Sequence, residues 1–252
     1  MNKYLERKVV NNNGVEIEYY VSNQVNEKST LIISMGIWEP AQRAFPLISR
    51  LLGRHCIVLS YRGRGNSSTP EAGYDWNHHR SDLACVLENE PIHKPVFLGF
   101  SKGVSYMLGY LSTNLDIAKG IIIIDYPAIH SKLEKGAAKF WGNLIYNGHR
   151  LDNFIDTHAL EGIEAESTYK EFYSVFQDIN CPVWLFRGTD LQSDIPSNLT
   201  EEDIIKYKSY VNSFEVIDFN YSGHMILDEE LGKATSQVKQ ILENIESYVD
   251  LG

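Results

Sequence analysis

A serine between two glycines is the first candidate for chemistry in this chain. Ser101 lies in the segment VFLGFSKGVSYM, with Gly99 two positions before it and Gly103 two positions after it. The apolar run before Ser101 is typical of a buried strand, and the residues after it are typical of the start of a helix. The pattern G-x-S-x-G between a strand and a helix predicts a tight turn that exposes the serine hydroxyl as a nucleophile.

A serine hydroxyl needs a base, because it is scarcely nucleophilic at neutral pH unless an imidazole takes its proton. The sequence has eight histidines. His224 follows the last apolar run in FNYSGHMILDEE, where Gly223 allows the loop to turn back toward the carboxyl edge of a sheet. We therefore predict that His224 is the base and interpret the other histidines as surface or structural residues.

A carboxylate is expected as the third member, because it holds the imidazole in the right tautomer. Two candidates follow apolar runs. Asp125 closes GIIIID, and Asp190 follows VWLFRGT. Both satisfy the chain order serine, acid, histidine. Either one could instead cap a helix or fix a loop, so the residues themselves leave both candidates open.

These side chains must be positioned by a series of alternating elements. Two strands are predicted around Asn13-Gly14, a pair that favours a hairpin turn. Six further β-branched runs follow, most of them separated by helix-like segments, which implies a mostly parallel sheet with helices on both faces. The six runs are STLIISMG, HCIVLSY, PVFLGF, KGIIIIDY, CPVWLFRG and SFEVIDF.

One interval breaks this alternation. Between Pro127 and Asn180 we find no convincing strand, only helical stretches such as LEKGAAKFWGNLIY and STYKEFYSVF. We predict an α/β core of residues 1–127 and 180–252, with residues 128–179 as a helical cap over the carboxyl edge. A final helix over residues 229–249 closes the fold.

Composition excludes several classes of protein. The chain has 252 residues, 43% of them hydrophobic, which suits one α/β domain. Its net charge of −10 argues against a nucleic-acid or anionic-membrane surface. The longest apolar runs are too short to span a membrane, and the N-terminus does not have the pattern of a signal peptide. We expect a cytoplasmic protein with three buried free thiols at Cys56, Cys85 and Cys181. We expect it to need no metal and no cofactor. It should act on a small molecule, as a monomer or a small homo-oligomer.

Four segments together resemble the α/β-hydrolase superfamily: SMGIWEP, YRGRGNSSTP, GFSKG and SGHM. The resemblance covers nearly the whole chain and implies an eight-stranded, mostly parallel sheet with a helical cap. In this superfamily the first loop usually begins His-Gly, whereas this chain has Met35-Gly36. The resemblance implies an oxyanion hole formed by the backbone N–H groups of Ile37 and Lys102.

The resemblance also bears on the acid. The commonest acid of the superfamily lies three residues after the glycine that follows the seventh strand. Counted from Gly188 that position is Leu191, so Asp190 falls one residue short. A minority of members place the acid directly after the sixth strand, as Asp125 would be. We therefore favour Asp125 and keep Asp190 as the alternative.

The function implied is that of a serine hydrolase that cleaves a small ester or amide-like substrate through an acyl-enzyme. Trp38 either lines the acyl pocket or packs in the core, and Trp141 and Tyr146 are further candidates for substrate contact. Arg62 and Asn66 are expected to make structural hydrogen bonds. Alternative functions are C–C bond hydrolysis, lactone opening, cofactor-free oxygenation, or a role as a small-molecule receptor or signalling protein. Aromatic residues of the cap more often serve packing than recognition: Trp141, Tyr146, Phe154, Phe172 and Phe176.

Overall fold

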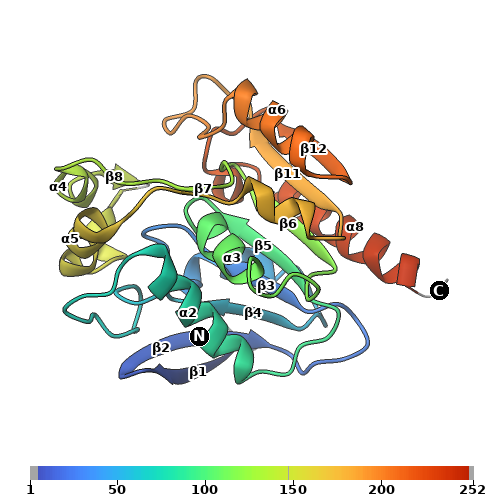
Figure 1. Cartoon of the computed structure of the whole chain (residues 1–252), viewed down its shortest axis with the longest axis horizontal. Coiled ribbons are helices and arrows are strands. Elements are labelled where there is room, and N and C mark those ends of the chain that lie inside the picture. Colours follow the sequence, from blue (N-terminus) through green and yellow to red (C-terminus); the bar gives the residue numbers. More distant parts are fainter. Residues whose placement is uncertain (1–4, 147, 250–252) are drawn as a thin grey trace.

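The computed structural model describes residues 5–146 and 148–249, which form an eight-stranded sheet (Figure 1). The strand order is β1-β2-β4-β3-β5-β6-β11-β12. The pairs β1/β2 and β2/β4 are antiparallel, and every other pair is parallel. The prediction of an eight-stranded, mostly parallel sheet is thus confirmed. The strands are β1 Leu5–Asn12, β2 Val15–Ser22, β3 Leu31–Ser34, β4 Cys56–Leu59, β5 Val96–Phe100, β6 Gly120–Ile124, β11 Val183–Gly188 and β12 Phe214–Phe219.

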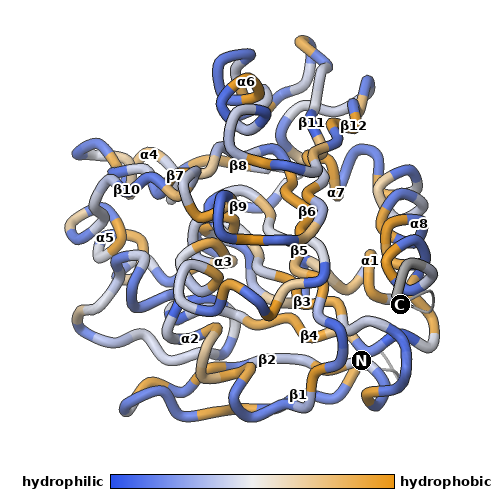
Figure 2. The backbone as a smooth tube through the Cα atoms, turned by 45° about the vertical axis from the view of Figure 1, so that its right-hand side comes forward, coloured by the Kyte–Doolittle hydropathy of each residue, from blue (hydrophilic) through white to orange (hydrophobic). Residues whose placement is uncertain are grey.

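Alternate side chains of the central strands enter two separate cores. Ile121 and Ile123 pack under α2, α3 and α6, whereas Ile122 and Ile124 pack under α1 and α8. This two-faced burial explains the uninterrupted apolar runs in the sequence. Figure 2 shows the hydrophobic residues concentrated on these central strands. The covering helices are α1 Phe45–Ile48, α2 Trp76–Glu88, α3 Gly103–Leu111, α6 Glu201–Tyr210 and α8 Leu231–Val249.

Turns and caps follow the local chemistry of the sequence. Asn13 and Gly14 join β1 to β2 with positive φ angles of 52° and 92°, as a two-residue hairpin requires. The side chain of Thr200 accepts a hydrogen bond from the Asp203 N–H at the start of α6, and the carboxylate of Asp203 accepts one from the backbone N–H of Thr200. The closing helix predicted over residues 229–249 is α8, and the short helix α7 Ile226–Glu229 precedes it.

The expectation that residues 128–179 hold helices and no strands is wrong in part. The stretch LEKGAAKFWGNLIY is helical only over Ala137–Gly142, because the chain leaves the helix at Asn143 and Ile145–Tyr146 pairs with His149–Arg150. In STYKEFYSVF, Lys170–Glu171 pairs with Ile129–His130, and only a short 3-10 helix follows. The elements here are β7 Ile129–His130, α4 Ala137–Gly142, β8 Ile145–Tyr146, β9 His149–Arg150, η2 Leu151–Asn153, α5 Thr157–Glu166, β10 Lys170–Glu171 and η3 Tyr173–Gln177.

Within this interval α4, α5 and β8 gather at one end of the molecule, to the left in Figure 1. Phe172 and Phe176 instead belong to the core of the sheet, where each is 1% exposed. Phe172 contacts Trp76 of α2, and Phe176 contacts Tyr207 of α6. These two aromatic residues therefore serve packing, at a distance from the segment that carries α4.

The three cysteines differ in their exposure to solvent. Cys56 and Cys181 are buried free thiols. Cys85 is a free thiol that is partly exposed, because it does not belong to the buried face of α2. No helix in residues 5–146 and 148–249 combines the length and the apolar character needed to cross a bilayer.

Candidate active site

The turn between β5 and α3 holds Ser101 in a left-handed conformation with φ 53°. Such a φ is unusual for a residue with a side chain and marks a strained turn. A Cβ atom on Gly103 would lie 2.3 Å from the carbonyl oxygen of Met35, and one on Gly99 would lie 2.9 Å from the Cα of Val104. Both glycines are therefore needed for the close approach of β5, α3 and the loop after β3.

The imidazole of His224 lies between the side chains of Ser101 and Asp125 and contacts both of them. Its Nε2 atom lies 2.9 Å from Oγ of Ser101, and its Nδ1 atom lies 2.9 Å from Oδ2 of Asp125. Phe100 stacks on the ring at a centroid distance of 5.0 Å, and the backbone N–H of His224 donates to the Ile195 carbonyl at 2.8 Å. The ring is buried, and it is held by stacking on one face and by the hydrogen bond of its backbone.

Asp125 is fully buried directly after β6, with a positive φ of 49°. Its carboxylate accepts hydrogen bonds from Gly188 N at 3.1 Å, Ser197 Oγ at 2.6 Å and Asn198 N at 2.9 Å, in addition to His224. These donors fix the carboxylate so that its remaining lone pair faces Nδ1–H of the imidazole. Asp125 is thus the acid that the structure brings to His224.

The carboxylate of Asp190 makes its hydrogen bond within its own loop. Its Oδ1 atom accepts a hydrogen bond from Gln192 N at 2.8 Å, which caps the turn that follows β11. No hydrogen bond joins Asp190 to His224 among the described residues. The alternative acid of the sequence analysis is therefore a loop-capping residue.

The loop after β3 lies directly against the nucleophile. A Cβ atom on Gly36 would lie 3.0 Å from the Cβ of Ser101 and 2.3 Å from Oε2 of the buried Glu39, so a side chain here would displace the groups beside the nucleophile. The backbone N–H groups of Ile37 and Lys102 have no protein acceptor in the described part of the chain. Arg64, fully buried, donates from Nε to the carbonyl oxygen of Ile37 at 2.8 Å and so fixes the peptide plane after Ile37.

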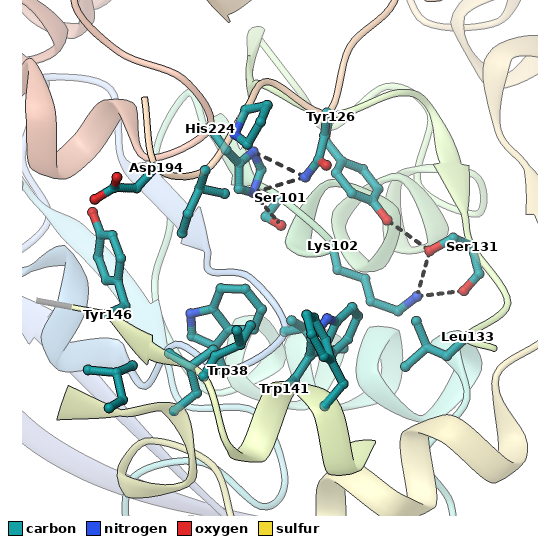
Figure 3. A pocket seen from close by; sticks show the side chains of 18 residues that line it. Trp38, Ser101, Lys102, Tyr126, Ser131, Leu133, Trp141, Tyr146, Asp194 and His224 are labelled. Atoms are coloured by element: carbon teal, nitrogen blue, oxygen red, sulfur yellow. Dashed lines mark hydrogen bonds between the residues drawn. The ribbon is translucent and has the colours of Figure 1, made fainter. Parts of the chain in front are cut away.

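Ser101 and His224 open into a cavity of about 630 Å³. Trp38 and Trp141 meet edge to face there, with ring centroids 5.8 Å apart. Figure 3 shows the two tryptophans across the cavity from His224, with Tyr146 to one side. All three aromatic residues that the sequence suggested for substrate contact line this cavity, and Trp38 packs against Trp141 as well.

The side chain of Lys102 also lines the cavity, a feature that sequence analysis missed because it considered only the backbone of this residue. Lys102 is 2% exposed, and its Nζ atom donates to the carbonyl oxygen of Ser131 at 2.6 Å and to its Oγ at 3.1 Å. Burial lowers the pKa of Lys102 to about 7; the nearby Asp75 opposes this shift and Arg64 adds to it.

A second buried ionisable group belongs to the loop after β3. Glu39 is 1% exposed, and neither of its carboxyl oxygens has a hydrogen-bond partner among the described residues. Burial raises the pKa of Glu39 to about 7, against the opposing effect of Arg43. No sequence signal marked this residue, because a glutamate in a loop is usually exposed.

Sequence reasoning also missed Ser197 and Asn198, which hold the carboxylate of Asp125. The side-chain nitrogen Nδ2 of Asn198 also lies 3.2 Å from each ring nitrogen of His224. Both residues come from the loop between β11 and α6. The only available signal was that this loop follows a parallel strand at its carboxyl end, where sites in α/β proteins usually lie.

Arg62 and Asn66 make hydrogen bonds away from the cavity, as the sequence analysis expected. Arg62 forms a paired interaction with Asp82, in which Nε and Nη2 donate at 2.9 and 2.6 Å. Asn66 donates to the buried carboxylate of Glu18 at 2.6 Å. In the described residues no group of three or more His, Cys, Asp or Glu side chains is arranged to hold a metal ion.

Comparison with solved structures identifies the fold. An esterase from Exiguobacterium antarcticum aligns with a TM-score of 0.75 at 17% identity, over 96% of this chain and 100% of that one. An esterase from a Rhodococcus species aligns with a TM-score of 0.74 at 17% identity, over 96% and 99%. A bromoperoxidase from Bacillus anthracis gives 0.73 at 18% identity, over 94% and 100%. No model of a known protein family matches the chain.

The strand order, the turn at Ser101 and these likenesses define one class. The chain has the α/β-hydrolase fold, with its mostly parallel sheet and its helices on both faces. At these identities the likeness extends to the fold alone, and the activity must be argued from the site.

Proposed function

We propose that this protein is a serine hydrolase that cleaves a small ester or amide-like carbonyl substrate through an acyl-enzyme. The observation that carries the proposal is the continuous hydrogen-bond chain from Ser101 through His224 to Asp125 at the wall of a largely apolar cavity. Hydrolase-fold esterases among the structural neighbours are consistent with it.

The proposed reaction begins when His224 Nε2 takes the proton of Ser101 Oγ, which attacks the substrate carbonyl carbon. Asp125 holds Nδ1–H and stabilises the imidazolium that forms. The backbone N–H groups of Ile37 and Lys102 bind the oxyanion, and one such donor contributes about 2.7–4 kcal/mol in related chemistry. His224 then protonates the leaving group. Water activated by the same imidazole attacks the acyl carbon and releases the acid.

We propose residues 128–179 as the cap over this site and Trp38, Trp141 and Tyr146 as apolar substrate contacts. The aromatic lining supports an apolar group on the substrate, since such walls bury apolar area without needing hydrogen bonds. The buried position of Ser101, 7% exposed, and His224, 2% exposed, supports the exclusion of bulk water during the reaction.

The test is hydrolysis of p-nitrophenyl esters from acetate to octanoate by wild type and Ser101→Ala. We expect an initial burst and steady turnover that Ser101→Ala abolishes while circular dichroism shows an unchanged fold. Survival of turnover in Ser101→Ala would contradict an acyl-enzyme on Ser101. Absence of turnover in the wild type would favour a receptor.

A further inference from the structure

Lys102 and Tyr126, both buried, and the half-buried Ser131 form a polar cluster in the otherwise apolar cavity next to Ser101. Lys102 Nζ donates to both oxygens of Ser131, and the hydroxyl oxygens of Ser131 and Tyr126 lie 3.0 Å apart. All three side chains line the cavity. Figure 3 shows Lys102 extending from the Ser101 turn to meet Ser131, with Tyr126 above them.

This cluster has more donors than acceptors. An ammonium group has three N–H donors, and Ser131 uses two of them. Ser131 and Tyr126 have one hydroxyl hydrogen each, and the bond between them uses one of the two. One N–H and one O–H are left without a protein acceptor in the described residues. Because these side chains line the cavity, an acceptor on a bound ligand can reach the two donors.

The positive charge of Lys102 indicates which kind of acceptor would bind to the cluster. No carboxylate of the described chain lies within 4.0 Å of Lys102 Nζ, the distance that defines an ion pair. The nearby Asp75 favours the ammonium but does not offset the cost of its burial, and an anion with two acceptor oxygens would relieve that cost. The lowered pKa of Lys102 is the sign that this cost is present in the unliganded protein.

The position of the cluster relates it to the nucleophile. Lys102 is the residue after Ser101, so the ammonium lies within one side-chain length of the atoms that would bind the reacting carbonyl. Asp194 lines the opposite, exposed side of the same cavity, next to Tyr146 (Figure 3). The cavity is therefore positive at the Lys102 end and negative at the Asp194 end.

We propose that Lys102, Ser131 and Tyr126 bind a carboxylate of the substrate, so that the protein selects esters or amides carrying a second, anionic group. This inference rests on the hydrolase function proposed above and adds the class of substrate. Lys102 then has two separate roles: its backbone N–H faces the oxyanion and its side chain sets specificity.

A binding test does not require turnover. Benzoate and benzamide are nearly isosteric and differ in charge, and binding to Ser101→Ala can be followed by the fluorescence of Trp38 and Trp141. We expect benzoate to bind at least about 10-fold more tightly than benzamide, since hydrogen bonds to charged groups are the stronger ones. Lys102→Met in the same background should abolish the preference. Lys132→Met, which removes an exposed lysine outside the cavity, should preserve it.

A kinetic test extends the comparison to substrates. The acetate esters of 3-hydroxybenzoate and 3-hydroxybenzamide place the anion in the leaving group, and 4-nitrophenyl adipate and hexanoate place it in the acyl group. We expect a higher kcat/KM for the anionic member of one pair, and a loss of that advantage of about 10-fold or more in Lys102→Met. The pair that responds shows on which side of the scissile bond the anion binds.

The two proposals fail separately. Equal binding of benzoate and benzamide, or a preference that survives Lys102→Met, would overturn the carboxylate site even if neutral esters are hydrolysed. Selective benzoate binding without hydrolysis of any ester would retain the site and overturn the hydrolase function. If Lys102→Met does not fold, Ser131→Ala combined with Tyr126→Phe serves as the second variant, and an unchanged preference in it would count against the site.

Discussion

Ser101 and Asp125 occupy the same level on neighbouring parallel strands. Phe100 and Ile124, the last residues of β5 and β6, are partners in the strand register, and Ser101 N donates to the carbonyl oxygen of Ile124 at 3.2 Å. Both residues adopt left-handed backbone conformations, with φ of 53° and 49°. The two strand ends thus turn in the same way and direct both side chains toward His224.

The first prediction concerns the identity of the acid. Asp125→Asn should lower kcat by about 10⁴-fold, because an amide cannot hold the imidazole in the required tautomer. Asp190→Asn, a matched change in a residue that only caps its own turn, should leave kcat within a few-fold. Ester hydrolysis by both variants, with circular dichroism as the control for folding, is the measurement. An equal or greater loss in Asp190→Asn would contradict the assignment.

The second prediction is the pH dependence of the preference for anionic substrates. Lys102 has a pKa lowered to about 7, so its ammonium form is lost as the pH rises through that value. The kcat/KM ratio of the anionic to the neutral ester should therefore be high at pH 6 and fall by pH 8.5. Both esters react with His224 as the base, so the contribution of that step to kcat/KM is common to both and cancels in the ratio. The charged and titratable groups that face Lys102 are Asp75, Arg64 and His130.

Lys102→Arg provides the matched control for this profile. A guanidinium stays protonated over the whole range, so the ratio in this variant should not decline with pH. A ratio that declines equally in wild type and Lys102→Arg would assign the titration to another group.

The third prediction concerns the stability cost of Glu39. Its pKa is raised from its ordinary 4.5 to about 7 in the folded protein, so the folded state binds the proton more tightly than the unfolded state does. The free energy of unfolding should consequently decrease as the pH rises from about 4.5 to 7 and then level off. Glu39→Gln removes the titration and should be more stable than wild type above pH 7, by about 3 kcal/mol.

Urea unfolding at pH 5, 6, 7 and 8 measures this difference. The gain of Glu39→Gln over wild type should grow with pH. Glu134→Gln, at an exposed position, should show no such growth. A constant difference between Glu39→Gln and wild type across the range would show that Glu39 does not carry the titration.

The fourth prediction concerns the buried ion pair of Arg62 and Asp82, whose exposed fractions are 5% and 0%. The guanidinium of Arg62 donates twice to this carboxylate, and Asn12 Nδ2 donates to it at 2.8 Å. Asp82→Asn leaves the guanidinium buried without a counter-charge and should lower the free energy of unfolding by about 3–5 kcal/mol. Asp116→Asn, an exposed aspartate, should change it by less than about 0.5 kcal/mol in the same urea titration. Similar unfolding midpoints for the two variants would refute the structural role of the pair.

Much of the fold could be predicted because its signals are local. The apolar runs of β3, β5 and β6 have side chains buried on both faces of a parallel sheet, and that burial requires an uninterrupted hydrophobic sequence. Asn13-Gly14 and Thr200 specify a turn and a cap within a few residues of chain. The interval of residues 128–179 was predicted less well, because its short elements depend on pairings such as that of β7 with β10, whose paired residues are 40 and 42 positions apart in the chain.

The sequence by itself determined the mostly parallel sheet, the strained turn at Ser101 and the chain order of serine, acid and histidine, because each depends on local pattern and backbone sterics. Only the tertiary structure shows that Asp125, and not Asp190, lies beside His224. Both follow strands, but the donors Gly188, Ser197 and Asn198 converge on Asp125 alone. The direction of the Lys102 side chain and the burial of Glu39 were likewise decided in three dimensions, since they depend on contacts with segments far away in the chain.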